Sequence, residues 1–411
     1  MLFLRFASLI ALLGISRAFD LKKNTNLAAY WGQNAGGDQG QFAAYCNDDT
    51  IDTLVMGFIN SFNSTGPSNQ PVINLSNICT AGPNNTFPGT GLADCSFLSD
   101  QIKACQKKGK AVTISLGGAN SAIGFTDEDD ARSFGDLIYN EFLGGNGELR
   151  PFGKAVLDGI DLDIEGGSPD HYAAFINRVK SRAAAAKQRV LITGAPQCPF
   201  PDVNMNEMLK TAPFDAVYVQ FYNNPGCELN NTEGFNFNVW DEFARNGSKN
   251  PDLKVYLGAP ASSKAATTGI LGMDDMQSLI TSTQVKFKSF GGVMLFDVSA
   301  ARDNNDYDKG VKLALTGKVT AKQTDSDSKI SVSSSSSAQP TNSTSSTTPV
   351  TATDSAIPTS SHLSAPTSAD FVLTDESADG NGEQSLGERG MPKVMSRHFR
   401  LLRKSAFEAT V

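Results

Sequence analysis

Short apolar runs of strand length recur between residues 26 and 315, separated by helix-length intervals. Each run is rich in Val, Ile, Leu or aromatic residues, and most end in Gly, Asn, Asp or Pro, as buried strands bounded by turns do. The eight predicted strands are Leu27–Trp31, Leu54–Ile59, Ala111–Leu116, Gly159–Ile164, Val190–Ala195, Ala216–Tyr222, Lys254–Gly258 and Gly292–Phe296. Amphipathic stretches between some of them predict the helices Asp130–Leu143, His171–Lys187 and Met273–Lys288.

Eight strand–helix units in this length of chain predict an α/β fold, a closed parallel (β/α)8 TIM barrel. A doubly wound open sheet is the competing architecture, but no Gly-rich phosphate-binding turn follows the first predicted strand. We therefore expect one barrel domain over residues 19–320. Functional side chains of such barrels lie at the carboxyl ends of the strands.

The fourth predicted strand, in the run Asp158-Gly-Ile-Asp-Leu-Asp-Ile-Glu165, alternates aliphatic and acidic residues. Its aliphatic face would pack against helices, and its acids Asp161, Asp163 and Glu165 would point into the barrel. The alternative is a helix with a solvated acidic side, because Asp158, Asp161 and Glu165 also share helical spacing. Gly159 and the run Gly166-Gly-Ser-Pro169 argue against that helix.

Carboxylates buried this close together would be very costly as structure alone, so they indicate chemistry. Because they repel, their protons leave in coupled steps, and at least one acid should keep its proton at unusually high pH. Glu165, at the end of the strand, could then act as a general acid. His is rare and no metal-ligand cluster is evident, so we expect no metal and no cofactor. Carboxylate-based glycoside cleavage is the commonest chemistry of this kind.

The N-terminal 18 residues predict a secretory signal peptide. Arg5 precedes an apolar run too short to span a membrane, and Ser16-Arg17-Ala18 resembles a cleavage site. Six cysteines without a CxxC pair agree with an oxidising compartment. Six Asn-x-Ser/Thr sequons begin at Asn63, Asn74, Asn84, Asn230, Asn246 and Asn342. We expect a secreted glycoprotein, extracellular or associated with the cell wall.

Composition changes abruptly near Thr320. Residues 321–369 are mostly Ser, Thr, Pro and Ala, which cannot bury enough apolar surface to fold. They predict a low-complexity linker or stalk, O-glycosylated or unmodified. Residues 370–411 begin acidic and turn basic, and predict a disordered charged tail.

The net charge of −8 argues against a nucleic-acid partner. No later segment is apolar enough for a membrane span, and we expect a monomer.

In its acidic strand and in several other motifs, the chain resembles glycoside hydrolase family 18, and within it the class III chitinases of plants and fungi. The run Asp158–Glu165 fits the family's DxxDxDxE pattern at every fixed position. The resemblance extends across residues 26–315. Its other motifs are Ala29-Tyr-Trp-Gly-Gln-Asn34, Ser115-Leu-Gly-Gly118, Ala195-Pro-Gln-Cys-Pro-Phe-Pro-Asp202, Val219-Gln-Phe-Tyr-Asn-Asn224 and Gly291-Gly-Val-Met-Leu295.

The resemblance implies a retaining mechanism in which the 2-acetamido group of the substrate is the nucleophile. Glu165 would protonate the glycosidic oxygen and later deprotonate water, while Asp163 would orient the acetamide. Asp161 would share a proton and charge with Asp163, and Tyr222 would bind the acetamide carbonyl. Asp158 would brace the start of the strand. Sugar-binding residues would be Tyr30, Phe58, Gln197, Gln220, Asn223 and Phe296.

Two further expectations come from the same resemblance. The six cysteines would pair as Cys46–Cys105, Cys79–Cys95 and Cys198–Cys227. Family members usually end the eighth strand with Trp, whereas this chain has Phe296 there. We expect that difference to reduce catalytic efficiency and to leave the class of reaction unchanged.

The resulting functional expectation is a chitinase that hydrolyses β-1,4-N-acetylglucosamine linkages in chitin and chito-oligosaccharides. One alternative is a non-catalytic chitin-binding lectin or inhibitor on the same barrel, which would typically lack one of the acids. Another is an endo-β-N-acetylglucosaminidase acting on N-glycans, which shares the mechanism and the acidic strand.

Overall fold

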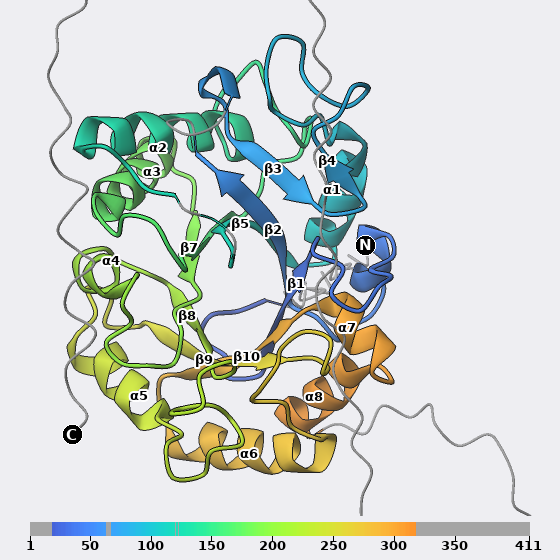
Figure 1. Cartoon of the computed structure of the whole chain (residues 1–411), viewed down its shortest axis with the longest axis vertical. Coiled ribbons are helices and arrows are strands. Elements are labelled where there is room, and N and C mark those ends of the chain that lie inside the picture. Colours follow the sequence, from blue (N-terminus) through green and yellow to red (C-terminus); the bar gives the residue numbers. More distant parts are fainter. Residues whose placement is uncertain (1–18, 63–66, 120, 122, 318–411) are drawn as a thin grey trace, which may run out of the picture. The chain divides into compact units, whose positions relative to one another are not determined.

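The computed structural model describes residues 19–62, 67–119, 121 and 123–317 (Figure 1). The sequence predictions for the signal peptide 1–18, the Ser/Thr/Pro-rich segment 321–369 and the tail 370–411 lie outside these residues. Within the described part of the chain, none of the helices combines the length and apolar character needed to cross a membrane.

Parallel strands close into the predicted TIM barrel. Around the barrel they run in the order β1-β10-β9-β8-β7-β6-β5-β2, and pairing of β1 with β2 closes the ring. Their bounds are β1 Asn26–Trp31, β2 Thr53–Ser61, β5 Ala111–Gly117, β6 Gly159–Asp163, β7 Leu191–Gly194, β8 Ala216–Gln220, β9 Lys254–Pro260 and β10 Phe290–Phe296. All eight strands expected from the apolar runs are therefore present, in the expected chain order.

Most strand boundaries differ from the prediction by one or two residues, and the differences at β8 and β10 have a structural explanation. Strand β8 ends at Gln220, so Tyr222 lies in the loop that follows it. Strand β10 begins at Phe290, before the predicted Gly292. Its pairing with β9 shifts register between Phe290 and Gly292, where the backbone of Gly292 has a φ of 146°. An irregular strand start rich in glycine shows no clear apolar alternation, which explains the late predicted boundary.

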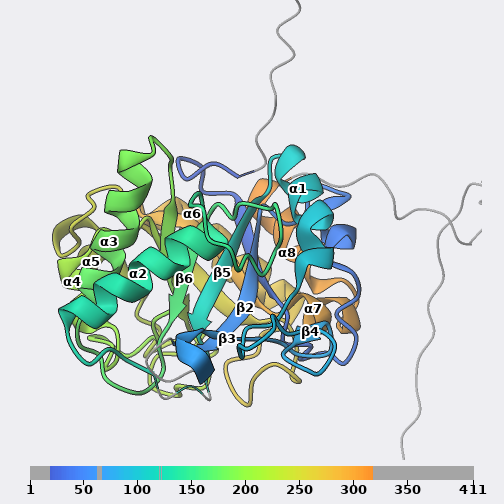
Figure 2. The ribbon, with the colours of Figure 1, turned by 90° about the horizontal axis from the view of Figure 1, so that it is seen from above.

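Helices cover the outside of the barrel (Figure 2). Their bounds are α1 Ser99–Lys107, α2 Glu128–Phe142, α3 Tyr172–Ala185, α4 Asn206–Thr211, α5 Phe237–Asn246, α6 Met273–Lys286, α7 Val298–Asp303 and α8 Tyr307–Thr316. Asp127 begins α2 because its carboxylate accepts from the backbone N–H groups of Asp129 and Asp130. The three predicted helices correspond to α2, α3 and α6.

A hairpin after β2 was not predicted. Strand β3 (Val72–Leu75) runs antiparallel to β2, and β4 (Cys79–Thr80) runs antiparallel to β3. Ile73 and Leu75 are buried, whereas the alternate positions are half-buried. Four residues give too short an alternation to distinguish a strand from a loop. The hairpin extends the wall beside the carboxyl end of β2.

The core has two layers separated by the barrel wall. The inner layer contains side chains that point into the barrel, among them Tyr30, Tyr218, Tyr256 and Met294. The outer layer lies between strands and helices and includes Ile160, Leu162 and Ile164 of the acidic strand. These three aliphatic residues are buried outward, as the alternation predicted.

Disulfides join Cys46 to Cys105, Cys79 to Cys95 and Cys198 to Cys227, the pairing that the family resemblance implies. At the start of the acidic strand, Oδ2 of Asp158 accepts from the backbone N–H of Val112 at 2.8 Å and from the Gln106 amide at 2.9 Å. Asp158 thus ties β6 to β5 and α1.

Candidate active site

The acids of β6 lie at increasing height in the barrel. Asp161 is fully buried, Asp163 is 4% exposed, and Glu165 is half-buried just beyond the carboxyl end of the strand. Asp163 and Glu165 line a cavity of about 290 Å³, and Asp161 lies beneath it. The strand alternation therefore places all three carboxylates inside the barrel and brings two of them to one cavity.

Three hydroxyl groups surround Asp161. Its Oδ2 accepts from Tyr30 Oη and from Ser115 Oγ, both at 2.7 Å, and its Oδ1 accepts from Thr193 Oγ1 at 2.6 Å. Burial raises the pKa of Asp161, although these hydrogen bonds favour the ionised form and act in the opposite direction. Ser115 and Thr193 lie opposite Asp161 in the neighbouring strands, so the barrel register itself forms this site.

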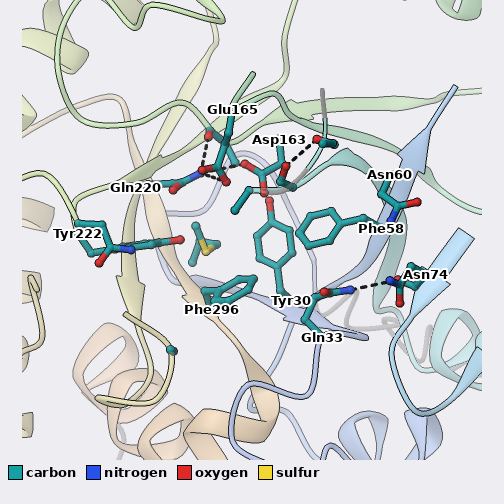
Figure 3. A pocket seen from close by; sticks show the side chains of 18 residues that line it. Tyr30, Gln33, Phe58, Asn60, Asn74, Asp163, Glu165, Gln220, Tyr222 and Phe296 are labelled. Atoms are coloured by element: carbon teal, nitrogen blue, oxygen red, sulfur yellow. Dashed lines mark hydrogen bonds between the residues drawn. The ribbon is translucent and has the colours of Figure 1, made fainter. Parts of the chain in front are cut away.

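Gln220 connects the upper two acids. Its Nε2 lies 2.8 Å from Asp163 Oδ1 and 3.5 Å from Glu165 Oε1, and it also donates to the Ala195 carbonyl at 2.9 Å. Because Nε2 lies between the two carboxylates, Gln220 holds them at a common edge of the cavity (Figure 3).

The proton affinity of this pair is high. Burial raises the pKa of Asp163 well above its usual value, and the negative charges of Glu165 and Asp161 add to that effect. Burial also raises the pKa of Glu165, against hydrogen bonds from Gln220, Asp163 and Gln197. Because both carboxyl groups lie within reach of the same Gln220 nitrogen and their charges repel, the two acids titrate together and not independently.

A braced loop after β7 presents Gln197 to Glu165. The Gln197 amide lies 3.3 Å from Glu165 Oε2, and its backbone N–H donates to Asp202 Oδ2 at 2.9 Å. The next residue, Cys198, is bonded to Cys227 in the loop after β8, and its carbonyl accepts from the Trp240 indole at 3.1 Å. The Gln197 side chain contacts Glu165 without lining the cavity.

Aromatic rings form another wall of the cavity. Tyr30 packs against Phe58 and Phe296, with ring centroids 5.8 Å and 5.7 Å apart, and Figure 3 shows the three rings gathered next to the acids. Tyr222 lies at the left of the same view, beyond Phe296, and is 6% exposed. Burial raises the pKa of its phenol well above the usual value, so Tyr222 remains a hydrogen donor near neutral pH.

Polar side chains from loops and from strands β2 and β3 complete the rim, and most of them were not predicted from the sequence. Gln33, Asn60 and Asn74 line the cavity, and Gln33 Nε2 donates to the carbonyls of Gly57 and Asn74 at 2.7 Å and 3.1 Å. Asn223 was predicted and also lines the cavity, but its Oδ1 accepts from Thr267, which fixes the side chain to the loop after β9. Gln33 belongs to the quoted Trp-Gly-Gln motif, whereas no signal in the sequence indicated Asn60, and Asn74 was indicated only as a glycosylation sequon.

Two glycines at the end of β5 allow the acidic strand to approach closely. A Cβ on Gly117 would lie 2.0 Å from the Asp163 carbonyl, and one on Gly118 would lie 3.0 Å from the Phe58 ring. Both residues have positive φ angles, 115° and 92°. The Gly118 N–H donates to that same Asp163 carbonyl at 2.8 Å. The Ser-Leu-Gly-Gly motif thus positions the backbone of Asp163 as well as the hydroxyl next to Asp161.

Chemically, the site combines a carboxyl pair with raised pKa values, amide donors and an apolar ring wall within one small cavity. Such a combination suits a neutral, hydroxyl-rich ligand with apolar faces, on which the acid pair can perform proton transfer.

Comparison with known proteins agrees with the family resemblance seen in the sequence. Residues 26–270 match the family model described as glycosyl hydrolases family 18. A chitinase 1 of Rhizopus niveus is 41% identical over 285 residues, which cover 69% of this chain and 55% of that protein. This chain therefore spans only about half the length of that relative.

Solved structures agree in fold and differ in activity. The ICChI chitinase of Ipomoea carnea is 34% identical, with a TM-score of 0.61, and the match covers 70% of this chain and 99% of that one. A xylanase and α-amylase inhibitor protein of Scadoxus multiflorus is 30% identical, with a TM-score of 0.60 over 72% and 99% of the two chains. With its TIM barrel, its acidic β6 strand and these matches, the chain belongs to glycosyl hydrolases family 18.

Proposed function

We propose that this protein is a chitinase that hydrolyses β-1,4-N-acetylglucosamine linkages in chitin and chito-oligosaccharides. The observation that carries the proposal is the pair Asp163 and Glu165, which share one cavity, have raised pKa values and contact the same Gln220 amide. The names of the relatives, chitinases in Rhizopus and Ipomoea, support the substrate class.

The composition of the cavity supports a substrate-assisted mechanism with retention. Among the described residues that line it, the only carboxylic acids are Asp163 and Glu165, which lie two residues apart along one stretch of chain. A double-displacement enzyme needs a nucleophilic carboxylate on the opposite side of the sugar from its acid. In its place, the acetamide oxygen of the substrate would attack the anomeric carbon and form an oxazolinium ion.

Each acid then has a distinct role in the reaction. Glu165 would donate a proton to the glycosidic oxygen as the bond to the anomeric carbon breaks, and would later accept a proton from the attacking water. Asp163 would accept a hydrogen bond from the acetamide N–H and stabilise the positive charge that develops on the ring. Asp161, held by three hydroxyls, would share charge and a proton with Asp163. The Tyr222 phenol would donate to the acetamide oxygen.

The ring wall would bind the reacting sugar. Phe296 and Tyr30 present an apolar surface on which the face of a pyranose can stack, while Gln33, Asn60, Asn74 and Asn223 offer polar groups along the rim. Phe58 and Gln197 would support these contacts from the edges of the site. Secretion to the cell exterior or cell wall, and action as a monomer, belong to the same proposal.

A second candidate function is suggested by the inhibitor from Scadoxus, which is 30% identical. A binding protein on this barrel would not need an intact acid pair, and Asp161, Asp163, Glu165 and Tyr222 are all in place here. An endo-β-N-acetylglucosaminidase would use the same acids, so only the substrate distinguishes it from a chitinase.

Product analysis on defined chito-oligosaccharides and on an N-glycopeptide separates the three candidates. We expect cleavage of chito-oligosaccharides with β-anomeric products at early times, as detected by proton NMR. Initial α-anomeric products would overturn the retaining mechanism. Cleavage of the N-glycopeptide alone would identify the endo-β-N-acetylglucosaminidase, and tight binding without cleavage would identify the lectin or inhibitor.

A further inference from the structure

The exposed side of α5 carries a shallow, mostly apolar groove that shares no lining residue with the active-site cavity. Its volume is about 700 Å³. Phe200, Val239 and Phe243 provide apolar lining, and the Phe200 ring is 38% exposed and packs against Phe243 with centroids 5.7 Å apart. A partly exposed phenylalanine ring is a surface on which another apolar face can stack.

A glycosylation sequon lies at the rim of this groove. Asn246 is the exposed last residue of α5 and begins the sequence Asn246-Gly-Ser248. Helical side chains point back toward the N-terminus, so Asn246 lies over the preceding turn, which contains Glu242 and Phe243. Its Nδ2 donates to Glu242 Oε1. The amide is therefore directed along the same face of the helix as the Phe243 ring.

The turn that follows α5 holds the sequon against this ring. A Cβ on Gly247 would lie 2.6 Å from Phe243 Cδ2, so only glycine fits at the middle position of the sequon. The N–H groups of Gly247 and Ser248 both donate to the Phe243 carbonyl, at 2.8 Å and 3.0 Å. The backbone after Asn246 is thus held to the last turn of α5, which fixes the position of Asn246 relative to the groove.

We propose that Asn246 carries an N-linked glycan whose first N-acetylglucosamine packs into the groove over Phe243 and Phe200. In the transfer, Nδ2 forms a bond to the anomeric carbon of a lipid-linked oligosaccharyl pyrophosphate. The carbon–oxygen bond to pyrophosphate breaks, the lipid pyrophosphate leaves, and Nδ2 loses one proton. The second Nδ2 hydrogen remains and can still donate to Glu242. This inference rests on passage through a secretory pathway, which the N-terminal sequence predicts, and not on the enzymatic activity.

A second sequon provides an internal contrast. Asn74 lines the active-site cavity, and its Oδ1 accepts from the backbone N–H of Ser76 at 2.8 Å. An oligosaccharide on Asn74 would fill the space that substrate needs, whereas one on Asn246 would cover a groove remote from the acids. We therefore expect Asn246 to be modified and Asn74 to be unmodified in the same molecule.

The first test is glycopeptide mass spectrometry on the full chain secreted from a eukaryotic host with high-mannose glycans. We expect a glycan on Asn246 and none on Asn74. Asn246→Gln and Ser248→Ala should each remove the mass of one glycan, and Ser248→Thr, which preserves the sequon, should not. An unmodified Asn246 overturns the proposal, whether or not other sequons carry glycans.

The second test measures the packing of the first sugar. Endoglycosidase H leaves one N-acetylglucosamine on each asparagine, so we expect the trimmed protein to keep the Tm of the untrimmed one. Asn246→Gln should melt roughly 2–4 °C lower. Wild type and Asn246→Gln produced with N-glycosylation blocked should have equal Tm values, which controls for the substitution itself. Equal Tm for the trimmed protein and Asn246→Gln would mean that the sugar does not pack on the groove.

Discussion

The Gln220 side-chain nitrogen lies 2.8 Å from Asp163 Oδ1, the shortest of its three hydrogen bonds, and the same nitrogen reaches Glu165 at 3.5 Å. One neutral donor therefore serves two carboxyl groups whose pKa values burial raises. Gln220 is at the end of β8, and β7 separates β8 from β6 in the sheet, so this contact forms only when the three strands pair in register.

We expect Gln220→Leu to lower kcat by roughly tenfold to a hundredfold, because a hydrogen bond to a charged group contributes about 1.5–3 kcal/mol. The bond favours the ionised form of Glu165, so its loss should raise the pKa of Glu165 and move the alkaline limb of the pH–rate profile to higher pH. Gln197→Leu removes the 3.3 Å contact to Glu165 and a 3.3 Å hydrogen bond from Asn224, but no contact to Asp163, and should have the smaller effect. Unchanged kcat and an unchanged profile for Gln220→Leu would mean that the bridge is irrelevant to turnover.

Glu165→Gln should lower kcat by at least 10²- to 10⁴-fold, the contribution of a general acid–base group, while the Kd for chito-oligosaccharides stays near that of wild type. Steady-state kinetics and calorimetric binding measure the two quantities. Asp170→Asn is the matched control, because Asp170 is an exposed acid in the same loop that lies outside the cavity. Wild-type turnover in Glu165→Gln would exclude Glu165 as the proton donor.

Phe296→Trp should raise kcat/KM on chito-oligosaccharides several-fold. Phe296 is half-buried at the end of β10, next to Tyr30, and a larger ring there would cover more of the sugar face, worth about 1 kcal/mol. The Tm must be measured beside kcat/KM, since overpacking against neighbours would lower both. Lower kcat/KM at unchanged Tm would show that Phe296 does not form the floor under the reactive sugar.

Glu141 on α2 should make stability depend on pH. It is 8% exposed, and burial raises its pKa from 4.5 to about 7. The nearby Arg150 offsets this only partly, because its guanidinium donates to the backbone carbonyls of Asn140, Leu143 and Ala155. A folded-state pKa above the unfolded value means that this contribution to stability is fully present below pH 4.5 and is lost as the pH rises through 7.

Glu141→Gln should therefore raise the Tm by a few degrees at pH 8 and much less at pH 4.5, as measured by calorimetry at both values. The exposed Glu128, at the start of the same helix, gives the control variant Glu128→Gln, which should leave the pH dependence unchanged. A Tm difference between wild type and Glu141→Gln that is the same at both pH values would contradict the raised pKa.

A chain ending at Lys322 should fold and hydrolyse soluble oligomers at the wild-type rate. The last helix, α8, ends at Thr316 and buries Tyr307, Val311 and Leu315 against the barrel. Every residue named in the active site precedes it. Circular dichroism, Tm and kcat/KM compare the two chains, and loss of soluble, active protein on truncation would show that the barrel depends on residues beyond 322.

The apolar and acidic pattern of the sequence determined the eight strands, their order along the chain and the faces of β6. Alternation with a period of two is a local property, so Ile160, Leu162 and Ile164 could be assigned outward and the acids inward without knowing their neighbours. Family resemblance supplied the cysteine pairs that the structure contains.

Which hydrogen-bond donors reach each acid depends on the tertiary structure. Tyr30, Ser115 and Thr193 come from three strands and meet at Asp161 because barrel closure and strand register bring them to one height. Asn60 and Asn74 reach the cavity from the end of β2 and the hairpin after it, segments too short or irregular for periodicity to predict. Periodicity along the sequence indicates on which face of a strand a side chain lies. Distances between segments far apart in sequence are fixed only when the strands pair and the core packs.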